Sequence, residues 1–185
     1  MKVQELKIKD LILIEPDVFG DNRGWFSETY SFEKYRNIGI SEIFIQDNQS
    51  YSAVKNVFRG IHFQKQPFAQ TKLVRCIRGK ILDIAVDLRK GSPTYKEYLA
   101  VELSSENKRQ LYIPKGFGHA FITITDDCEV CYKVDTPYNK GADRSIQALD
   151  PEIGLDFDLS ELVRSEKDTN APFLRDSDCD FIYEK

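Results

Sequence analysis

Short apolar segments recur along the chain and alternate with stretches that are rich in Gly, Pro, Asp and Ser. Their lengths and their content of β-branched and aromatic residues are typical of β-strands. Turn signals such as Gly79 and Asp126–Asp127 separate them. This regular spacing predicts an all-β fold, an antiparallel barrel or double-sheet jelly roll. The predicted strands are Leu11–Ile14, Gly24–Tyr30, Phe44–Ser52, Phe58–Gln64, Lys72–Arg78, Ile81–Leu88, Tyr98–Leu103, Gln110–Ile113, His119–Thr125 and Glu129–Val134.

The predicted strand Ile81–Leu88 alternates between two kinds of side chain. From Leu82 to Leu88 its even-numbered residues are all apolar and share one face, whereas the other face carries Asp83 and Asp87. A face with carboxylates is either solvated or lines a polar pocket. The sequence alone does not choose between these, and we expect the solvated face.

Helical signals are few. Phe32–Ile38 is predicted as one short helix, with Ser31 as its N-cap and Gly39 after its C-terminus. The tail after Pro151 is rich in Asp, Ser and Pro, which predicts short turns packed on the barrel. No repeat or linker interrupts the chain, so residues 1–185 are predicted to form a single domain with short peripheral helices.

Composition excludes several classes of function. The net charge of −4 argues against binding nucleic acid or anionic membranes by bulk electrostatics, so an anionic ligand needs a local basic cluster. No apolar run approaches the roughly 18 residues that a membrane-spanning helix needs. Met1–Lys7 lacks the apolar core of a signal peptide. The expected location is the cytoplasm.

Cysteine spacing gives no sign of a metal or redox site. Cys128 and Cys131 form a Cys-x-x-Cys, but no second pair completes a zinc site. An odd spacing within a strand places the two sulfur atoms on opposite faces. We therefore expect all four cysteines to be reduced thiols, as is usual in the cytoplasm.

The only two histidines lie in two motifs. His119 ends Pro-x-Gly-x-x-His, which resembles the second signature of the cupin β-barrels, and His62 lies in the predicted strand Phe58–Gln64. A metal-binding cupin needs several ligands that converge, as in His-x-His followed by a carboxylate. Gln64 and Lys72 stand at those positions instead. The motifs predict a cupin barrel without metal, in which His, Lys and Arg side chains perform acid/base chemistry.

An ordered set of motifs carries a more specific resemblance. Together these motifs resemble the dTDP-4-dehydrorhamnose 3,5-epimerase family, metal-free cupin enzymes of dTDP-L-rhamnose synthesis. The resemblance extends from about Leu11 to Pro172. The motifs are Asp21–Glu28, Gln46–Asn48, Arg59–Gln64, Lys72–Arg75, Asp83–Arg89, Glu106–Gln110 and Ser165–Asp168.

The resemblance implies a reaction and four catalytic residues. The substrate is a 4-keto-6-deoxy sugar on dTDP, whose C3 and C5 hydrogens are acidified by the ketone. Inversion needs a base on one face, an acid on the other and stabilisation of the enolate between them. By resemblance His62 is the base, Asp168 orients it, Tyr132 is the acid and Lys72 stabilises the enolate. No cofactor is implied.

The resemblance also implies how substrate is held. Arg23, Arg59 and Lys167 contact phosphates or sugar oxygens, His119 contacts the sugar or diphosphate, and Tyr138 stacks on the thymine. The family forms homodimers by strand exchange near the N-terminus, so Arg23, Phe26 and Glu28 serve the partner subunit. The implied substrate-binding residues are Arg23, Phe26, Glu28, Gln46, Asp47, Asn48, Arg59, Lys72, His119, Tyr138, Asp143 and Lys167.

Some positions depart from the family pattern. Asp143 stands where a substrate-contacting Glu is usual and is one methylene shorter, and Thr71 replaces a common Gly. Arg59 and His62 are an odd number of residues apart, so an ideal strand points them to opposite faces. Both reach one site only if Gly60 permits a bulge or a strong twist. Asp83 is left open as a partner of Lys72 or His119.

Competing functions are separated by single residues. An epimerase that acts at one carbon only is the nearest alternative, and the presence of both His62 and Tyr132 favours double epimerisation. If the protein were a non-catalytic sugar-binding cupin, we would expect the base or the acid to be missing, whereas both are present. A ketoisomerase relative is expected to carry a second His just after the first, where Phe63 and Gln64 stand. A metal dioxygenase needs more than two histidines.

Overall fold

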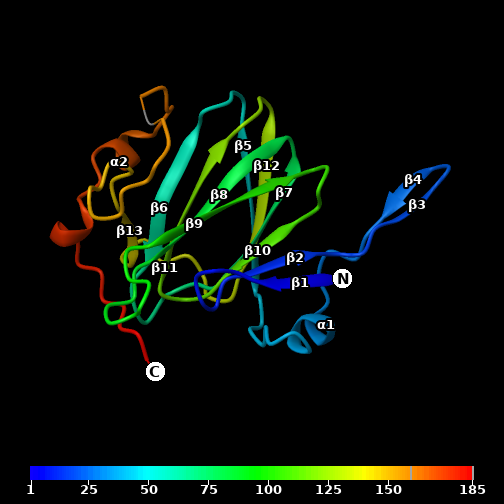
Figure 1. The fold of residues 1–185 in the computed structure, drawn as a ribbon, viewed down its shortest axis with the longest axis horizontal. Coiled ribbons are helices and arrows are strands. Elements are labelled where there is room, and N and C mark those ends of the chain that lie inside the picture. Colours follow the sequence, from blue (N-terminus) through cyan, green and yellow to red (C-terminus); the bar gives the residue numbers. More distant parts are fainter. Residues whose placement is uncertain (159, 185) are drawn as a thin grey trace.

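Two antiparallel sheets face each other and form the barrel, which Figure 1 shows from one side. The computed structural model describes residues 1–158 and 160–184. The six-stranded sheet has the order β1 (Lys2–Glu5), β2 (Ile12–Glu15), β10 (Gln110–Ile113), β7 (Lys72–Arg78), β12 (Cys128–Val134) and β5 (Gln46–Ser52). The five-stranded sheet has the order β13 (Asp143–Ser145), β6 (Phe58–Gln64), β11 (Phe117–Thr123), β8 (Lys80–Asp87) and β9 (Tyr98–Ser104). The predicted double-sheet fold is confirmed.

Most predicted strands are present, and β6, β7 and β10 have the predicted bounds. The segment Gly24–Tyr30 was predicted too long, because strand β4 covers only Gly24–Phe26. It pairs with β3 (Phe19–Asp21) in a separate hairpin that extends away from the barrel (Figure 1). Strands β1, β3 and β13 were not predicted. All three are short and lie at a sheet edge or in the hairpin, where few apolar positions mark them.

Apolar side chains pack on the inner and the outer faces of the sheets, so the hydrophobic core consists of layers. Between the sheets, Val74 and Leu111 of one sheet meet Ala85 and Phe121 of the other. The C-terminal segment covers the outer face of the five-stranded sheet, as predicted for the tail. Helix α1 (Phe32–Arg36) covers part of the outer face of the six-stranded sheet. Phe58, Phe117 and Phe121 are buried core residues.

The prediction of a solvated carboxylate face on β8 is wrong. Asp83 and Asp87 both have 0% exposure. The apolar face with Ile84 and Val86 packs against the C-terminal segment, so it lies outside the barrel. The face with the two carboxylates therefore points between the sheets. An alternating pattern shows that the faces differ, but it does not show which one faces the centre of a structure with covered outer faces.

The two helices differ from the predictions at their ends. Helix α1 ends at Arg36 rather than Ile38, and the side chain of Ser31 makes no capping hydrogen bond. A second helix, α2 (Glu166–Thr169), was not predicted, and its N-cap Ser165 accepts a hydrogen bond from the backbone N–H of Asp168. A 3₁₀ turn covers Leu174–Asp176. Within the described residues no helix is both long and apolar enough to cross a membrane.

Strand β6 contains the irregularity that was expected at Gly60. His62 pairs with His119 on β11, but Arg59 pairs with Phe121, so β6 has one extra residue in this interval. A Cβ atom on Gly60 would lie 2.2 Å from the Cβ of Ala120, and its φ of +148° is unusual for other residues. The bulge lets Arg59 and His62 line one cavity in spite of their odd spacing.

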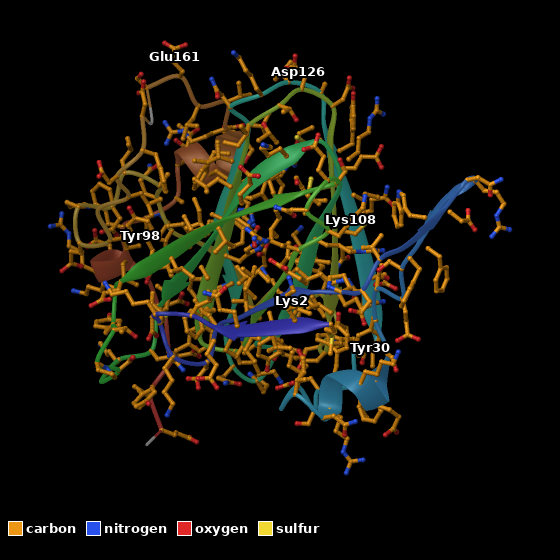
Figure 2. All side chains as sticks on the ribbon, turned by 45° about the vertical axis from the view of Figure 1, so that its right-hand side comes forward. Lys2, Tyr30, Tyr98, Lys108, Asp126 and Glu161 are labelled. Carbon is orange, nitrogen blue, oxygen red and sulfur yellow. The ribbon has the colours of Figure 1, made fainter. Side chains whose placement is uncertain are left out.

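The cysteines and exposed side chains complete the description. All four cysteines are free thiols; Cys128 is buried inside, whereas Cys131 lines a hollow on the outer face of the same sheet, as the spacing predicted. Figure 2 shows side chains crowded within the barrel, while those of the β3–β4 hairpin stand clear of it. Phe26 on this hairpin is 67% exposed.

Candidate active site

A cavity of about 670 Å³ opens inside one end of the barrel. A smaller one of about 230 Å³ adjoins it, because His62, Lys72, Tyr132 and Lys167 line both. The structure therefore brings together most of the residues that the sequence analysis selected. The selected residues that line either cavity are Gln46, Asn48, Arg59, His62, Lys72, His119, Tyr132, Tyr138, Asp143, Lys167 and Asp168.

His62 and Asp168 form a hydrogen-bonded pair across 106 residues of sequence. The Nε2 atom of His62 lies 2.6 Å from Oδ1 of Asp168, which is only 3% exposed. Burial alone would raise the pKa of the Asp168 carboxyl, but the hydrogen bonds from His62, from the Ser165 hydroxyl and from the backbone N–H of Gly60 lower it overall. An ionised carboxylate only accepts hydrogen bonds, so Nε2 carries the proton and Nδ1 of His62 is free to accept one.

Lys72 on β7 is a buried amine. Within residues 1–158 and 160–184 its ammonium group has no ion pair or hydrogen bond. Burial lowers its pKa to about 8, although the charges of Asp83 and Asp143 act in the opposite direction. Its Nζ atom lies 5.9 Å from the centre of the Tyr132 ring. With a pKa of about 8, Lys72 can carry a positive charge at neutral pH, and no ion pair within the described residues neutralises that charge.

Tyr132 enters the cavity from the six-stranded sheet, opposite to the sheet that carries His62. Burial raises the pKa of its phenol, so the hydroxyl stays protonated at neutral pH and can donate a proton. One cavity is therefore lined by an imidazole from one sheet and a phenol from the other.

His119, the partner of His62 on the neighbouring strand β11, forms a second His–Asp pair. Its Nε2 atom lies 2.8 Å from Oδ1 of Asp83. Burial lowers the pKa of His119 in spite of the neighbouring carboxylate. The side chain lines the larger cavity, and its ring centre lies 6.5 Å from that of Tyr132.

Charged and amide side chains surround the smaller cavity. Lys167 donates to Asp143 at 2.6 Å, and the hydroxyl of Tyr138 lies 3.3 Å from the same carboxylate. On β5, the amide of Gln46 donates to Asn48 at 2.8 Å. Asp143 thus lies within the site, although its side chain is one methylene shorter than the Glu that is usual at this position in the family.

Arg59 closes the larger cavity near the end of β5. Its guanidinium donates to the carbonyl oxygen of Tyr51 at 2.9 Å and to the hydroxyl of Ser52 at 3.3 Å. These neutral partners leave its positive charge available for an anionic ligand.

Four of the selected residues do not reach the cavities of their own chain. Arg23 and Phe26 belong to the exposed hairpin, and Glu28 follows it and pairs with Lys34 at 2.8 Å. Asp47 lies on the outer face of β5 and pairs with Lys133 at 2.8 Å. Side chains alternate between the two faces of β5, so Asp47 points away from the face that carries Gln46 and Asn48. Asp47 was selected because it belongs to the same motif, although this alternation argued against it.

Supporting contacts that the sequence analysis missed hold the site together. Ser165 caps α2 and fixes the backbone of Asp168. Gln64 donates to the carbonyl oxygens of Phe68 and Pro137 and accepts from the N–H of Asn139, which anchors the loop that carries Tyr138. A Ser three residues before an acidic residue is a recognisable capping signal, whereas the Gln64 contacts join segments far apart in sequence.

An acid and a base that enter one cavity from opposite sheets of a cupin-type barrel define a class of proton-transferring isomerases. Comparisons with known proteins agree with this class. The family model described as dTDP-4-dehydrorhamnose 3,5-epimerase matches residues 5–176. The dTDP-4-dehydrorhamnose 3,5-epimerase of Methanothermobacter thermautotrophicus is 47% identical over 169 residues, which cover 90% of each chain.

Two further relatives support the same conclusion. The dTDP-4-dehydrorhamnose 3,5-epimerase of Salmonella typhimurium is 46% identical and covers 94% of this chain and 96% of its own. The structure of a dTDP-6-deoxy-D-glucose-3,5-epimerase from Legionella pneumophila, in complex with dTDP-4-keto-L-rhamnose, superposes with a TM-score of 0.90 at 41% identity. It covers 94% of this chain and 93% of that one. The chain belongs to the dTDP-4-dehydrorhamnose 3,5-epimerase family and is an isomerase.

Proposed function

We propose that this isomerase converts dTDP-4-dehydro-6-deoxy-D-glucose to dTDP-4-dehydro-L-rhamnose by inverting C3 and C5. The observation that supports this best is the position of His62 and Tyr132, which line one cavity from opposite sheets. Inversion at a carbon requires removal of a proton from one face and its return to the other. The 4-keto group acidifies both carbons, so one acid/base pair can act on each in turn.

In the proposed mechanism His62 takes the proton and Lys72 stabilises the charge. The Nδ1 atom of His62 removes the hydrogen from C3 or C5, and the electron pair moves to the C4 oxygen as an enolate. The Lys72 ammonium stabilises that oxygen, which is worth about 3–4 kcal/mol of barrier for a positioned donor. Asp168 holds the tautomer of His62 and stabilises the imidazolium.

Tyr132 completes the inversion by protonating the carbon from the opposite face. The ketone forms again, and the electrons return from the C4 oxygen to the carbon. Exchange with solvent then restores the phenol of Tyr132 and the neutral imidazole of His62. The sequence of steps transfers protons only, so it needs no redox cofactor.

Substrate binding follows from the charges around the two cavities. We propose that Arg59 and Lys167 contact the diphosphate, that Tyr138 stacks on the thymine, and that Gln46, Asn48 and Asp143 contact the sugar nucleotide. The 59% exposure of Tyr138 leaves its ring face open for stacking.

Labelling with deuterium tests the reaction. The enzyme is incubated with dTDP-4-dehydro-6-deoxy-D-glucose in deuterated water, and NMR locates the label and the stereochemistry. Deuterium at both C3 and C5 of an inverted product is expected. Inversion and label at one carbon only would support the single-site epimerase instead, and no exchange at either carbon would contradict the proposed function.

Activity should survive chelation. Gln64 and Lys72 stand where a metal cupin has ligands, and the charge on the enolate is assigned to Lys72 rather than to a metal. Exhaustive treatment with EDTA, checked by elemental analysis, should leave kcat/KM within about twofold. Loss of turnover with chelation and its return with one added metal would overturn the assignment.

We also propose that the enzyme is a cytoplasmic homodimer in which hairpins are exchanged. The exposed Phe26 and the unpaired outer edge of β5 offer an apolar arm and a strand edge of the kind that self-association covers. Arg23, Phe26 and Glu28 then enter the partner subunit's site. A cytoplasmic location fits the free thiols.

A mixing experiment tests the exchange of hairpins. Arg23→Ala and His62→Ala are each expected to be poorly active as homodimers. A heterodimer has one complete site, which combines His62 of one subunit with the hairpin of the other. Random mixing should restore about a quarter of wild-type activity, because half of the dimers are mixed. A sedimentation profile of a fully active monomer would contradict the proposal.

A further inference from the structure

Asp83 is a buried carboxylate to which the proposed reaction gives no role. It has 0% exposure, and its Oδ1 atom lies 2.8 Å from Nε2 of His119. Its other oxygen, Oδ2, is buried and has no hydrogen-bond partner among the described residues. A buried carboxylate that is only partly satisfied costs free energy, so its presence calls for a function.

The bond to Asp83 decides which nitrogen of His119 carries the proton. An ionised carboxylate cannot donate, so Nε2 must be the protonated atom. In the neutral ring Nδ1 then holds a lone pair. Burial lowers the pKa of His119 in spite of the neighbouring Asp83 carboxylate, which opposes a second proton on the ring.

The Nδ1 atom of His119 belongs to a ring that lines the larger cavity. Within the part of the chain that the structure describes, no protein group makes a hydrogen bond to this atom. The His119 side chain lines the larger cavity together with His62, Lys72 and Tyr132, the residues of the proposed reaction. Its ring lies 6.5 Å from that of Tyr132, so a group bound to Nδ1 would lie close to the reacting sugar.

We infer that Asp83 is a positioning residue that holds His119 as a hydrogen-bond acceptor, and that His119 thereby recognises a hydroxyl of the sugar rather than the diphosphate. Phosphate oxygens are acceptors themselves and cannot bond to a lone pair, whereas the C2 and C3 hydroxyls of the hexose can donate. This inference rests on the proposed function for the identity of the ligand. The sequence analysis left open whether His119 contacts the sugar or the diphosphate, and this inference assigns it to the sugar.

The tautomer of His119 can be measured directly in the wild-type protein. The chain has only two histidines, so ¹⁵N NMR of histidine-labelled enzyme gives two rings, and His119→Gln assigns them. We expect His119 to be neutral at pH 7.5, with the proton on Nε2. A proton on Nδ1, or on both nitrogens, would overturn the inference without any further variant.

Asp83→Asn tests the consequence for binding. The side-chain amide can donate to Nε2, which would move the ring proton to Nδ1 and turn the acceptor into a donor. Binding is measured by calorimetry with dTDP-L-rhamnose, a stable dTDP-hexose, and with dTDP. We expect dTDP-L-rhamnose to bind about 10- to 100-fold more weakly, and dTDP to change by less than about twofold.

Asp87→Asn is the matched control for loss of a buried carboxylate. Asp87 lies on the same strand and the same face, has 0% exposure, and bonds to Arg89, Ser92 and Thr94 rather than to a histidine. It should leave the His119 tautomer and both affinities unchanged. Equal weakening of dTDP and dTDP-L-rhamnose by Asp83→Asn, or no weakening of either, would overturn the inference. These measurements involve no turnover, so they are independent of the labelling test of the reaction.

Discussion

His62→Ala should abolish both product formation and the uptake of solvent deuterium at C3 and C5. Without the imidazole no group takes the proton, so no enolate forms and nothing exchanges. The loss of a positioned base typically lowers the rate on the order of 10²–10⁴-fold. NMR in deuterated water measures product and exchange in the same sample.

Tyr132→Phe separates the second half of the reaction from the first. His62 can still form the enolate in this variant, so deuterium should enter with retention of configuration while inversion is lost. Both variants should bind dTDP nearly as well as wild type, because the proposed nucleotide contacts of Arg59 and Tyr138 are retained in each. Wild-type exchange in His62→Ala would remove His62 from the mechanism, and inversion at a wild-type rate in Tyr132→Phe would remove Tyr132.

The pairing of His62 with Asp168 illustrates what sequence could provide. Periodicity predicted β6 with its correct bounds, and the odd spacing of Arg59 and His62 meant that both could reach one site only with a bulge or strong twist at Gly60. Asp168, by contrast, lies in a polar tail that local patterns assign to solvent. Only the ordered motif set selected it, because a contact across 106 residues leaves no trace in local periodicity.

The error at Asp83 has a different cause. Strand alternation correctly separated the two faces of β8, but the choice of the inner face depended on what covers the outer one. The C-terminal segment covers that face through Leu174 and Phe181, and its apolar residues are too scattered to predict such packing. As a result the carboxylates were expected in solvent, whereas both are fully buried.

The hairpin residues show which kind of role cannot be assigned from a single chain. Arg23, Phe26 and Glu28 were selected by motif, yet in their own chain they lie outside both cavities. Neither composition nor periodicity indicates that a residue serves another subunit. Such an assignment follows from the resemblance and from the exposure of Phe26, and the mixing experiment addresses it directly.

Lys72→Met should make the protein more stable and nearly inactive. The pKa of Lys72 is lowered to about 8, below its ordinary value of 10.5, so the charged form is less favourable in the folded state than in the unfolded one. The resulting loss of folding stability is complete below pH 8, becomes smaller between pH 8 and pH 10.5, and is absent above pH 10.5. At pH 7 it corresponds to about 3 kcal/mol.

A methionine of similar length removes this cost, so the urea midpoint of Lys72→Met should rise at pH 7, and the gain should disappear toward pH 10.5. The same variant should lose about 10²–10³-fold in kcat, because the ammonium group that is proposed to stabilise the enolate is gone. In the wild type kcat/KM should fall as the pH rises through about 8, where the free enzyme loses the Lys72 charge. Lys72→Arg is the control, since it keeps the charge and should move that fall to higher pH. Lower stability of Lys72→Met at pH 7, or full activity without the amine, would show that Lys72 is a structural residue and not the cation of the reaction.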